Sequence, residues 1–150
     1  MIDVENIVIT AVKNAVDAEF GSSYPGIKVY GFPVAQPESF PCVIVFMTDN
    51  YTYRFSQEFG KLRENHAYVT FAVSVYANNA NTKKTVARDV FKVVDETLQD
   101  LKLTRIMAGP VENIDRTLAR YEGRYQGVVG EGITTMIDGV ETTLYPVFRP

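Results

Sequence analysis

A run in which apolar residues recur at every second position, from about Asn65 to Ala77, constrains the fold of this chain most. Successive side chains of a strand point to opposite faces of a sheet, so a period of two predicts one long strand. The apolar positions are Ala67, Val69, Phe71, Val73 and Val75. The opposite positions are His66, Tyr68, Thr70, Ser74 and Tyr76. We expect the first face to be core and the second to be at least partly wet or paired.

Two segments carry apolar residues at three- and four-residue spacing, which predicts amphipathic helices. The first helix extends from about Ile2 to Phe20, with Asp3 as its N-cap and Gly21 just past its end. The second extends from about Thr82 to Leu101. Its basic residues are Lys83, Lys84, Arg88 and Lys92, and its acidic residues near the C-terminal half are Asp95, Glu96 and Asp100. A solvated face is expected for both sets, with a docking patch as the alternative for the basic row.

Shorter β-prone runs lie between these two helices. A short edge strand is expected at Ile27–Tyr30, inside the otherwise irregular, Pro- and Gly-rich segment Ser22–Ser39. A buried strand then extends from Cys42 to Met47, and Asp49-Asn50 predicts a turn after it. The next two segments are Tyr51 to Phe55, a polar aromatic strand or loop, and Gln57 to Glu64, a mobile connection.

The C-terminal third predicts further strands. A short strand from Leu103 to Met107 is expected to end at Gly109-Pro110, and a long strand follows from Thr117 to Val129. Gly123 and Gly127 within it suggest bulges or a close approach of another group to the backbone. Asp138-Gly139 between two β-prone runs predicts a hairpin. The expected fold is α+β: a mainly antiparallel sheet of four or five strands packed by two helices in one domain (1–150), with a projecting C-terminal hairpin (130–147).

Composition excludes several classes of protein. With 46% apolar and 22% charged residues the chain is not a disordered tail, and its net charge of −3 argues against a dedicated nucleic-acid binder. No apolar run approaches the roughly 20 residues that span a bilayer, and the acidic start of the chain argues against export. The one cysteine, Cys42, is expected to be buried and inert.

The sequence offers little for catalysis. His66 is the one imidazole, so a Ser-His-Asp or Cys-His arrangement has a single candidate base, and one His with one Cys cannot complete a zinc site. The glycines from Gly123 to Gly132 precede a hairpin rather than the helix that a phosphate-binding loop requires. We therefore expect no catalytic residues, no metal site and no cofactor.

Two surfaces are candidates for contacts with other chains. Arg120, Glu122 and Arg124 alternate along one face of the long C-terminal strand, which is either a solvated face or a contact with another copy. The hairpin carries apolar residues although an isolated hairpin is marginal in water, so it is expected to pack on the chain's own body or, with some preference, on another subunit. Its apolar residues are Ile133, Met136, Ile137, Val140, Leu144 and Tyr145.

A series of local motifs occurs in a fixed order over roughly two-thirds of the chain. The series is Phe40-Pro41, Asn65-His66-Ala67, Phe71 to Asn78, Val93-Val94-Asp95-Glu96, Leu103-Thr104-Arg105, Gly109-Pro110 and Asn113 to Gly123. In this order the series resembles the tail terminator (tail completion) proteins of long non-contractile-tailed bacteriophages and related prophages. Each motif alone is ordinary strand, helix or turn sequence, so the order carries the resemblance. The segment Ser22–Ser39 and the hairpin after Gly130 depart from the family pattern.

The resemblance implies a ring of subunits, commonly six, that caps the tail tube and presents a docking surface to the head. It further implies no enzymatic activity, a location at the head–tail junction of the virion, and a central channel through which DNA passes without specific binding. The implied partners are the chain itself, a tail tube protein and a head completion or connector protein. A head-to-tail ring needs two different complementary patches, for which the candidates are the Arg120/Glu122/Arg124 face and the loop from Tyr51 to Arg63. The candidate loop residues are Tyr51, Tyr53, Arg54, Phe55, Phe59 and Arg63.

Three alternatives remain open from the sequence. Another head–tail joining or tube-like protein would use similar strands. A ligand-binding or regulatory α+β module would have a pocket for a small molecule. A hydrolase is the remotest of the three, since the sequence shows no clear general base.

Overall fold

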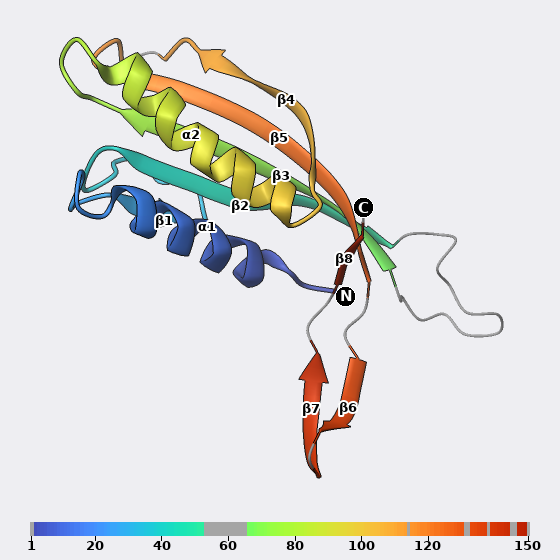
Figure 1. Cartoon of the computed structure of the whole chain (residues 1–150). Helices are drawn as coiled ribbons and strands as arrows, with labels where there is room; N and C mark the ends of the chain where they lie inside the picture. The colour runs from blue at the N-terminus through green and yellow to red at the C-terminus, as the bar shows by residue number, and fades with distance from the viewer. Residues whose placement is uncertain are drawn as a thin grey trace.

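The computed structural model describes residues 2–52, 66–113, 115–130, 133–137, 139–144 and 147–149, and it confirms the α+β class (Figure 1). The elements in chain order are α1 (Glu5–Phe20), β1 (Lys28–Tyr30), β2 (Cys42–Thr52), β3 (His66–Ala77), α2 (Lys83–Asp100), β4 (Thr104–Val111), β5 (Ala119–Gly130), β6 (Ile133–Ile137), β7 (Val140–Leu144) and β8 (Val147–Arg149).

One sheet organises the described part of the chain. Its strands lie in the order β1-β2-β3-β5-β4, and β8 adds a short pairing to the end of β5. Only β1 and β2 pair in parallel; the other pairs, β2 with β3, β3 with β5, β4 with β5 and β5 with β8, are antiparallel. The alternation that predicted the long strand is confirmed, because β3 pairs with both β2 and β5 along its length.

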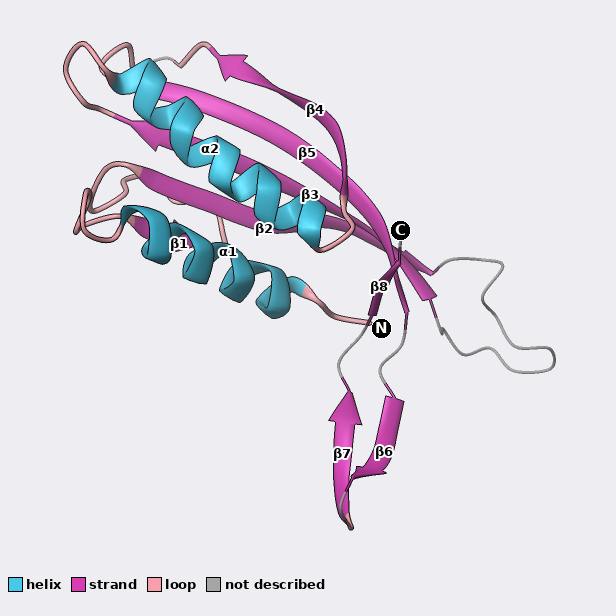
Figure 2. Cartoon of the chain, in the orientation of Figure 1, coloured by secondary structure: helices cyan, strands magenta, loops and turns pink. Residues whose placement is uncertain are grey.

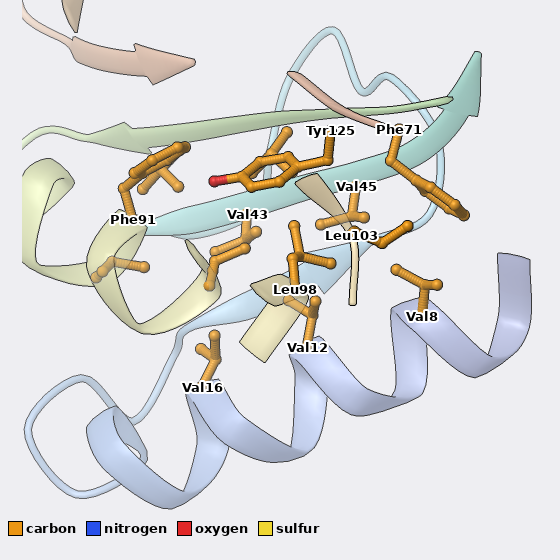
Figure 3. Close-up of a cluster of buried hydrophobic side chains, with 14 of the residues drawn as sticks. Val8, Val12, Val16, Val43, Val45, Phe71, Phe91, Leu98, Leu103 and Tyr125 are labelled. Atoms are coloured by element: carbon orange, nitrogen blue, oxygen red, sulfur yellow. The ribbon is translucent and has the colours of Figure 1, made fainter. Parts of the chain in front are cut away.

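Both helices lie on the same face of this sheet, with α1 over the β1–β2 side and α2 over β3, β5 and β4 (Figure 2). The core fills the space between the helices and the sheet (Figure 3). Its labelled members include Val8, Val12 and Val16 of α1, Val43 and Val45 of β2, Phe71 of β3, Phe91 and Leu98 of α2, and Tyr125 of β5. Burial of each such side chain stabilises the fold by about 1.5–3 kcal/mol.

Two predicted strand ends are wrong, and pairing explains both. β2 continues through Asp49-Asn50 to Thr52, because a bulge between Met47 and Asp49 absorbs the irregularity while pairing with β3 continues. β4 likewise continues through Gly109-Pro110 to Val111. It is an edge strand with β5 as its one neighbour in the sheet order, and a proline is tolerated at an edge because it lacks only the N–H donor.

The ends of α1 differ in detail from the predicted caps. The helix begins at Glu5 with Val4 at the N-cap position, yet the Asp3 carboxylate accepts a 3.0 Å hydrogen bond from the backbone N–H of Glu5. Gly21 lies at the C-cap in a right-handed conformation, with φ of −58°. The prediction of Asp3 as the N-cap is therefore wrong by one residue, and Gly21 is the C-cap itself rather than the residue after it.

Gly123 and Gly127 provide the close approach that the sequence predicted. A Cβ at Gly123 would lie 2.6 Å from Cζ of Phe91, and one at Gly127 would lie 2.7 Å from Cδ2 of Leu103. Neither position is a bulge in the pairing of β5 with β3. The bulge lies instead in the neighbouring strand β4, between Arg105 and Met107.

The predicted C-terminal hairpin is confirmed. Strands β6 and β7 form a separate two-stranded sheet that extends away from the main body (Figure 1). Gly139 in the turn has a φ of +80°, a conformation that glycine adopts without steric cost. Strand β8 was not predicted; it follows the hairpin and pairs with Val128–Gly130 of β5, and Phe148 packs against the core.

Candidate assembly surface

The face of the sheet opposite the helices is the first candidate surface. Among the described residues no helix lies on that face (Figure 2). By the pairing register, alternate positions of β3, β5 and β4 contribute side chains to it. Cross-strand partners share a face, so Tyr76 lies beside Arg120, Ser74 beside Glu122 and Ala72 beside Arg124. The predicted face of Arg120, Glu122 and Arg124 is thus opposite the face that packs on α2.

The three charged residues of this row differ in their surroundings. Arg120 forms an ion pair with Glu122, and its guanidinium carbon lies 5.5 Å from the centroid of the Tyr76 ring. Ser74 Oγ donates a 3.1 Å hydrogen bond to the same Glu122 carboxylate. Burial raises the pKa of Tyr76, and the nearby Arg120 opposes that shift. Arg124 is exposed and makes no ion pair with any described residue, so it is the member of the row most accessible to a partner.

Arg120 retains unused hydrogen-bonding capacity. Its Nε is buried and makes no hydrogen bond to the described part of the chain, although the side chain as a whole is partly exposed. Further along the same face, Tyr68 Oη donates a 2.5 Å hydrogen bond to Oε1 of Gln126. The row therefore contains two separate groups of bonded polar side chains, one around Arg120 and Glu122 and one of Tyr68 with Gln126, rather than solvated charges alone.

Exposed apolar side chains mark the strand ends and edges. Ile106 and Met107, which are 53% and 47% exposed, lie at the bulge of the edge strand β4. Tyr51 is 61% exposed near the end of β2, and its hydroxyl donates a 3.2 Å hydrogen bond to Asp49. Tyr51 was predicted as an interface residue, whereas sequence reasoning missed Ile106 and Met107 as exposed residues, because a bulge determines which way they point.

A basic hollow lies where α2 begins, β4 ends and β5 begins. It has a volume of about 460 Å³, and its cationic lining residues are Lys83, Lys84, Arg116 and Arg120. A second hollow of about 190 Å³ shares Lys84 and Arg120 with it and adds Arg88. Lys83 donates a hydrogen bond to the backbone carbonyl of Arg116. The basic row on α2 was predicted, but Arg116 and Arg120 come from other segments, so their approach to it could not be read from local spacing.

Asp95 contradicts the prediction of a solvated acidic face on α2. It is buried, and its carboxylate accepts hydrogen bonds from Tyr125 Oη at 2.6 Å, Gln99 Nε2 at 2.6 Å and Arg105 NH1 at 3.1 Å. The prediction was wrong because Tyr125 and Arg105 belong to strands that pack under the C-terminal half of α2. Glu96 and Asp100 are exposed, as predicted.

The remaining predicted contact residues are only partly described. Tyr53, Arg54, Phe55, Phe59, Arg63 and Tyr145 lie outside the described residues, as does the predicted connection at 57–64. Ile133, Met136, Ile137, Val140 and Leu144 lie in the hairpin strands β6 and β7, whose backbone alone is described.

Residues considered for chemistry are placed as follows. His66 begins β3, opposite Gly130 of β5. Cys42 is buried as predicted, and burial raises the pKa of its thiol to about 11. Within the described ranges, no group of three or more His, Cys, Asp or Glu residues could hold a metal ion.

Neither described helix is long and apolar enough to cross a membrane.

Comparison with known proteins finds no family model that matches this chain and no significant match among curated proteins.

Proposed function

We propose that this chain is a virion structural protein: a ring-forming tail terminator that caps the tail tube, stops its elongation and joins the tail to the head connector. The observation that carries the proposal is the ordered series of motifs described above. Most of the residues in that series fall on β3, α2, β4 and β5, which contact one another as one packed unit. If this chain shared its architecture with the family that it resembles, the motifs would be expected to fall in this order along one folded unit.

The surfaces of the molecule support a role in assembly. A hairpin that forms its own two-stranded sheet is marginally stable in water unless it packs on another surface. The polar sheet face and the exposed apolar pair on β4 are further surfaces for a second chain. A head-to-tail ring requires two different surfaces on each subunit, and the molecule offers more than two.

The net charge supports a role as a conduit for DNA. At −3 the chain would displace few counterions from a duplex, and counterion release supplies most of the affinity of non-specific DNA binding. A ring with this charge would let DNA pass through its channel without retaining it. Such a protein would act in the host cytoplasm during assembly and remain at the head–tail junction of the virion.

Negative-stain electron microscopy together with mass measurement in solution tests the proposal. A six-membered ring would have six times the 16.8 kDa mass of one chain, or about 101 kDa. We expect annuli with an open centre, alone or on the ends of tubes formed by a tail tube protein. A compact monomer that binds a metabolite in a deep pocket, and that forms no annulus with or without tubes, would refute the proposal.

Replacement of the hairpin separates assembly from folding. Gly130 and Val147 are directly paired in the β5–β8 ladder, so a two-residue Asp-Gly turn can replace residues 131–146 without moving either strand. We expect this variant to keep the far-ultraviolet circular dichroism and cooperative unfolding of the parent chain but to lose annuli. Loss of cooperative unfolding would instead assign the hairpin to the folded core, and unchanged annuli would remove it from the contact.

A further inference from the structure

Charged residues at one end of the helical layer oppose the dipoles of both helices. Asp17 and Glu19 are exposed in the last turn of α1, and that turn carries no basic residue. Lys83 and Lys84 occupy the first turn of α2, and that turn carries no acidic residue, although Asp115 from outside the helix interacts electrostatically with Lys83. A helix C-terminus disfavours anions and an N-terminus disfavours cations, so both sets weaken the helices that carry them.

These two sets lie at the same end of the strands and on opposite sides of the molecule. The strand register defines that end. Lys28 pairs with Cys42, so β1 and β2 both begin there. Cys42 pairs with Tyr76, and Ala77 pairs with Ala119, so β3 ends there and β5 begins there. Helices α1 and α2 run antiparallel, so α1 ends where α2 begins (Figure 1). Helix α1 lies on the β1 side of the sheet and α2 toward the β4 side.

The basic residues face away from α1. Lys84 and Arg88 line the smaller hollow together with Pro110 and Tyr121, on the β4 side of α2. Arg116 is exposed beside the same end of β4. Lys84, Arg88 and Arg116 make no ion pair with any described residue, and Lys84 and Arg88 repel one another across one helical turn. We call Lys84, Arg88 and Arg116 the basic edge, and Asp17 and Glu19 the acidic edge.

Resting on the proposed function, we infer that the basic edge of one subunit binds the acidic edge of the next, so that this pairing closes the ring. Cyclic symmetry places equivalent points at equal height along the axis. If the strands run along the ring axis, the basic edge and the acidic edge lie at the same height because both are at the same end of the strands. The basic edge of one subunit can then meet the acidic edge of its neighbour. The contact would join α1 of one copy to the β4 side of its neighbour, and each set of charges would compensate the other.

Charge reversal on each edge tests this pairing. The first variant is Lys84→Glu/Arg88→Glu and the second is Asp17→Lys/Glu19→Lys. Alone, each variant places like charges on both sides of the contact, and we expect the concentration of half-assembly to rise at least about tenfold. Mixed in equal amounts, the two variants can alternate around a ring with opposite charges at every contact, and we expect annuli to return.

The matched control is Lys92→Glu/Lys102→Glu, which reverses two exposed cations toward and just beyond the C-terminal end of α2, outside both edges, and changes the net charge by the same amount as the first variant. We expect it to assemble like the parent chain. If the parent chain forms annuli and both single-edge variants do so at the same concentration, the inference falls while the proposed function stands. If the mixture stays dissociated although both variants unfold cooperatively, the inference falls as well. If the parent chain forms no annuli, with or without tubes, both fall together.

Discussion

The buried hydrogen bond between Tyr125 and Asp95 offers the sharpest test of the interior. Tyr125 is fully buried, and its hydroxyl donates to Asp95 at 2.6 Å. Burial, followed by the hydrogen bond and charge of Asp95, raises the pKa of Tyr125, so the hydroxyl remains protonated and able to donate at neutral pH. Tyr125→Phe would remove this donor and retain the ring that packs in the core.

The expected cost follows from the partners that Asp95 keeps. After Tyr125→Phe the Asp95 carboxylate still accepts hydrogen bonds from Gln99 and Arg105. It therefore loses one of its three donors and is not left without a hydrogen-bond partner. Hydrogen bonds to charged groups contribute about 1.5–3 kcal/mol, and we expect the free energy of unfolding to fall by that amount. For a domain of this size the melting temperature would fall by roughly 3–12 °C.

Urea unfolding at pH 7 of four proteins measures the coupling: the parent chain, Tyr125→Phe, Asp95→Asn and the double variant. Because the neutral amide is a weaker acceptor, we expect Tyr125→Phe to cost at least about 1 kcal/mol less in the Asp95→Asn background. Arg105→Met is the comparison variant; the Arg105 side chain is 49% exposed, so its loss should cost about 1 kcal/mol or less. A cost below about 0.5 kcal/mol for Tyr125→Phe, or an equal cost in both backgrounds, would refute this account of the cluster.

Two further predictions concern the core. Gly123→Ala would place a methyl group 2.6 Å from Phe91 and should destabilise the fold by about 1–3 kcal/mol, whereas Gly109→Ala, which meets nothing within 4 Å, should stay within about 0.5 kcal/mol; equal urea midpoints for the two would contradict the packing. Because burial raises the pKa of Cys42 from 9.0 to about 11, its thiolate forms more readily in the unfolded chain, and stability should be lost as pH rises from about 9 to about 11. The parent chain should lose about 2–3 kcal/mol of unfolding free energy more than Cys42→Ala over this pH range. If the difference in unfolding free energy between the two proteins does not change with pH, this prediction is wrong.

Local periodicity was sufficient to predict the main elements. The two-residue period of β3, the helical spacing of α1 and α2, and the Asp-Gly turn of the hairpin depend on residues close in sequence. Each pattern is a direct consequence of backbone geometry, because side chains repeat every 2 residues in a strand and every 3.6 in a helix. The fold class and the face that β5 buries follow from the same patterns.

Tertiary contacts decided what local patterns could not. β2 continues past Asp49-Asn50 because β3 supplies a partner for it there. β8 can pair with β5 because β5 extends past Thr104, the first residue of β4. Asp95 is buried because Tyr125, thirty residues away, donates to it across the core. The basic hollow likewise forms from segments that meet only after the sheet is assembled. Spacing along the chain determines which side chains share a face, whereas the long-range pairing of strands and helices determines what each face meets.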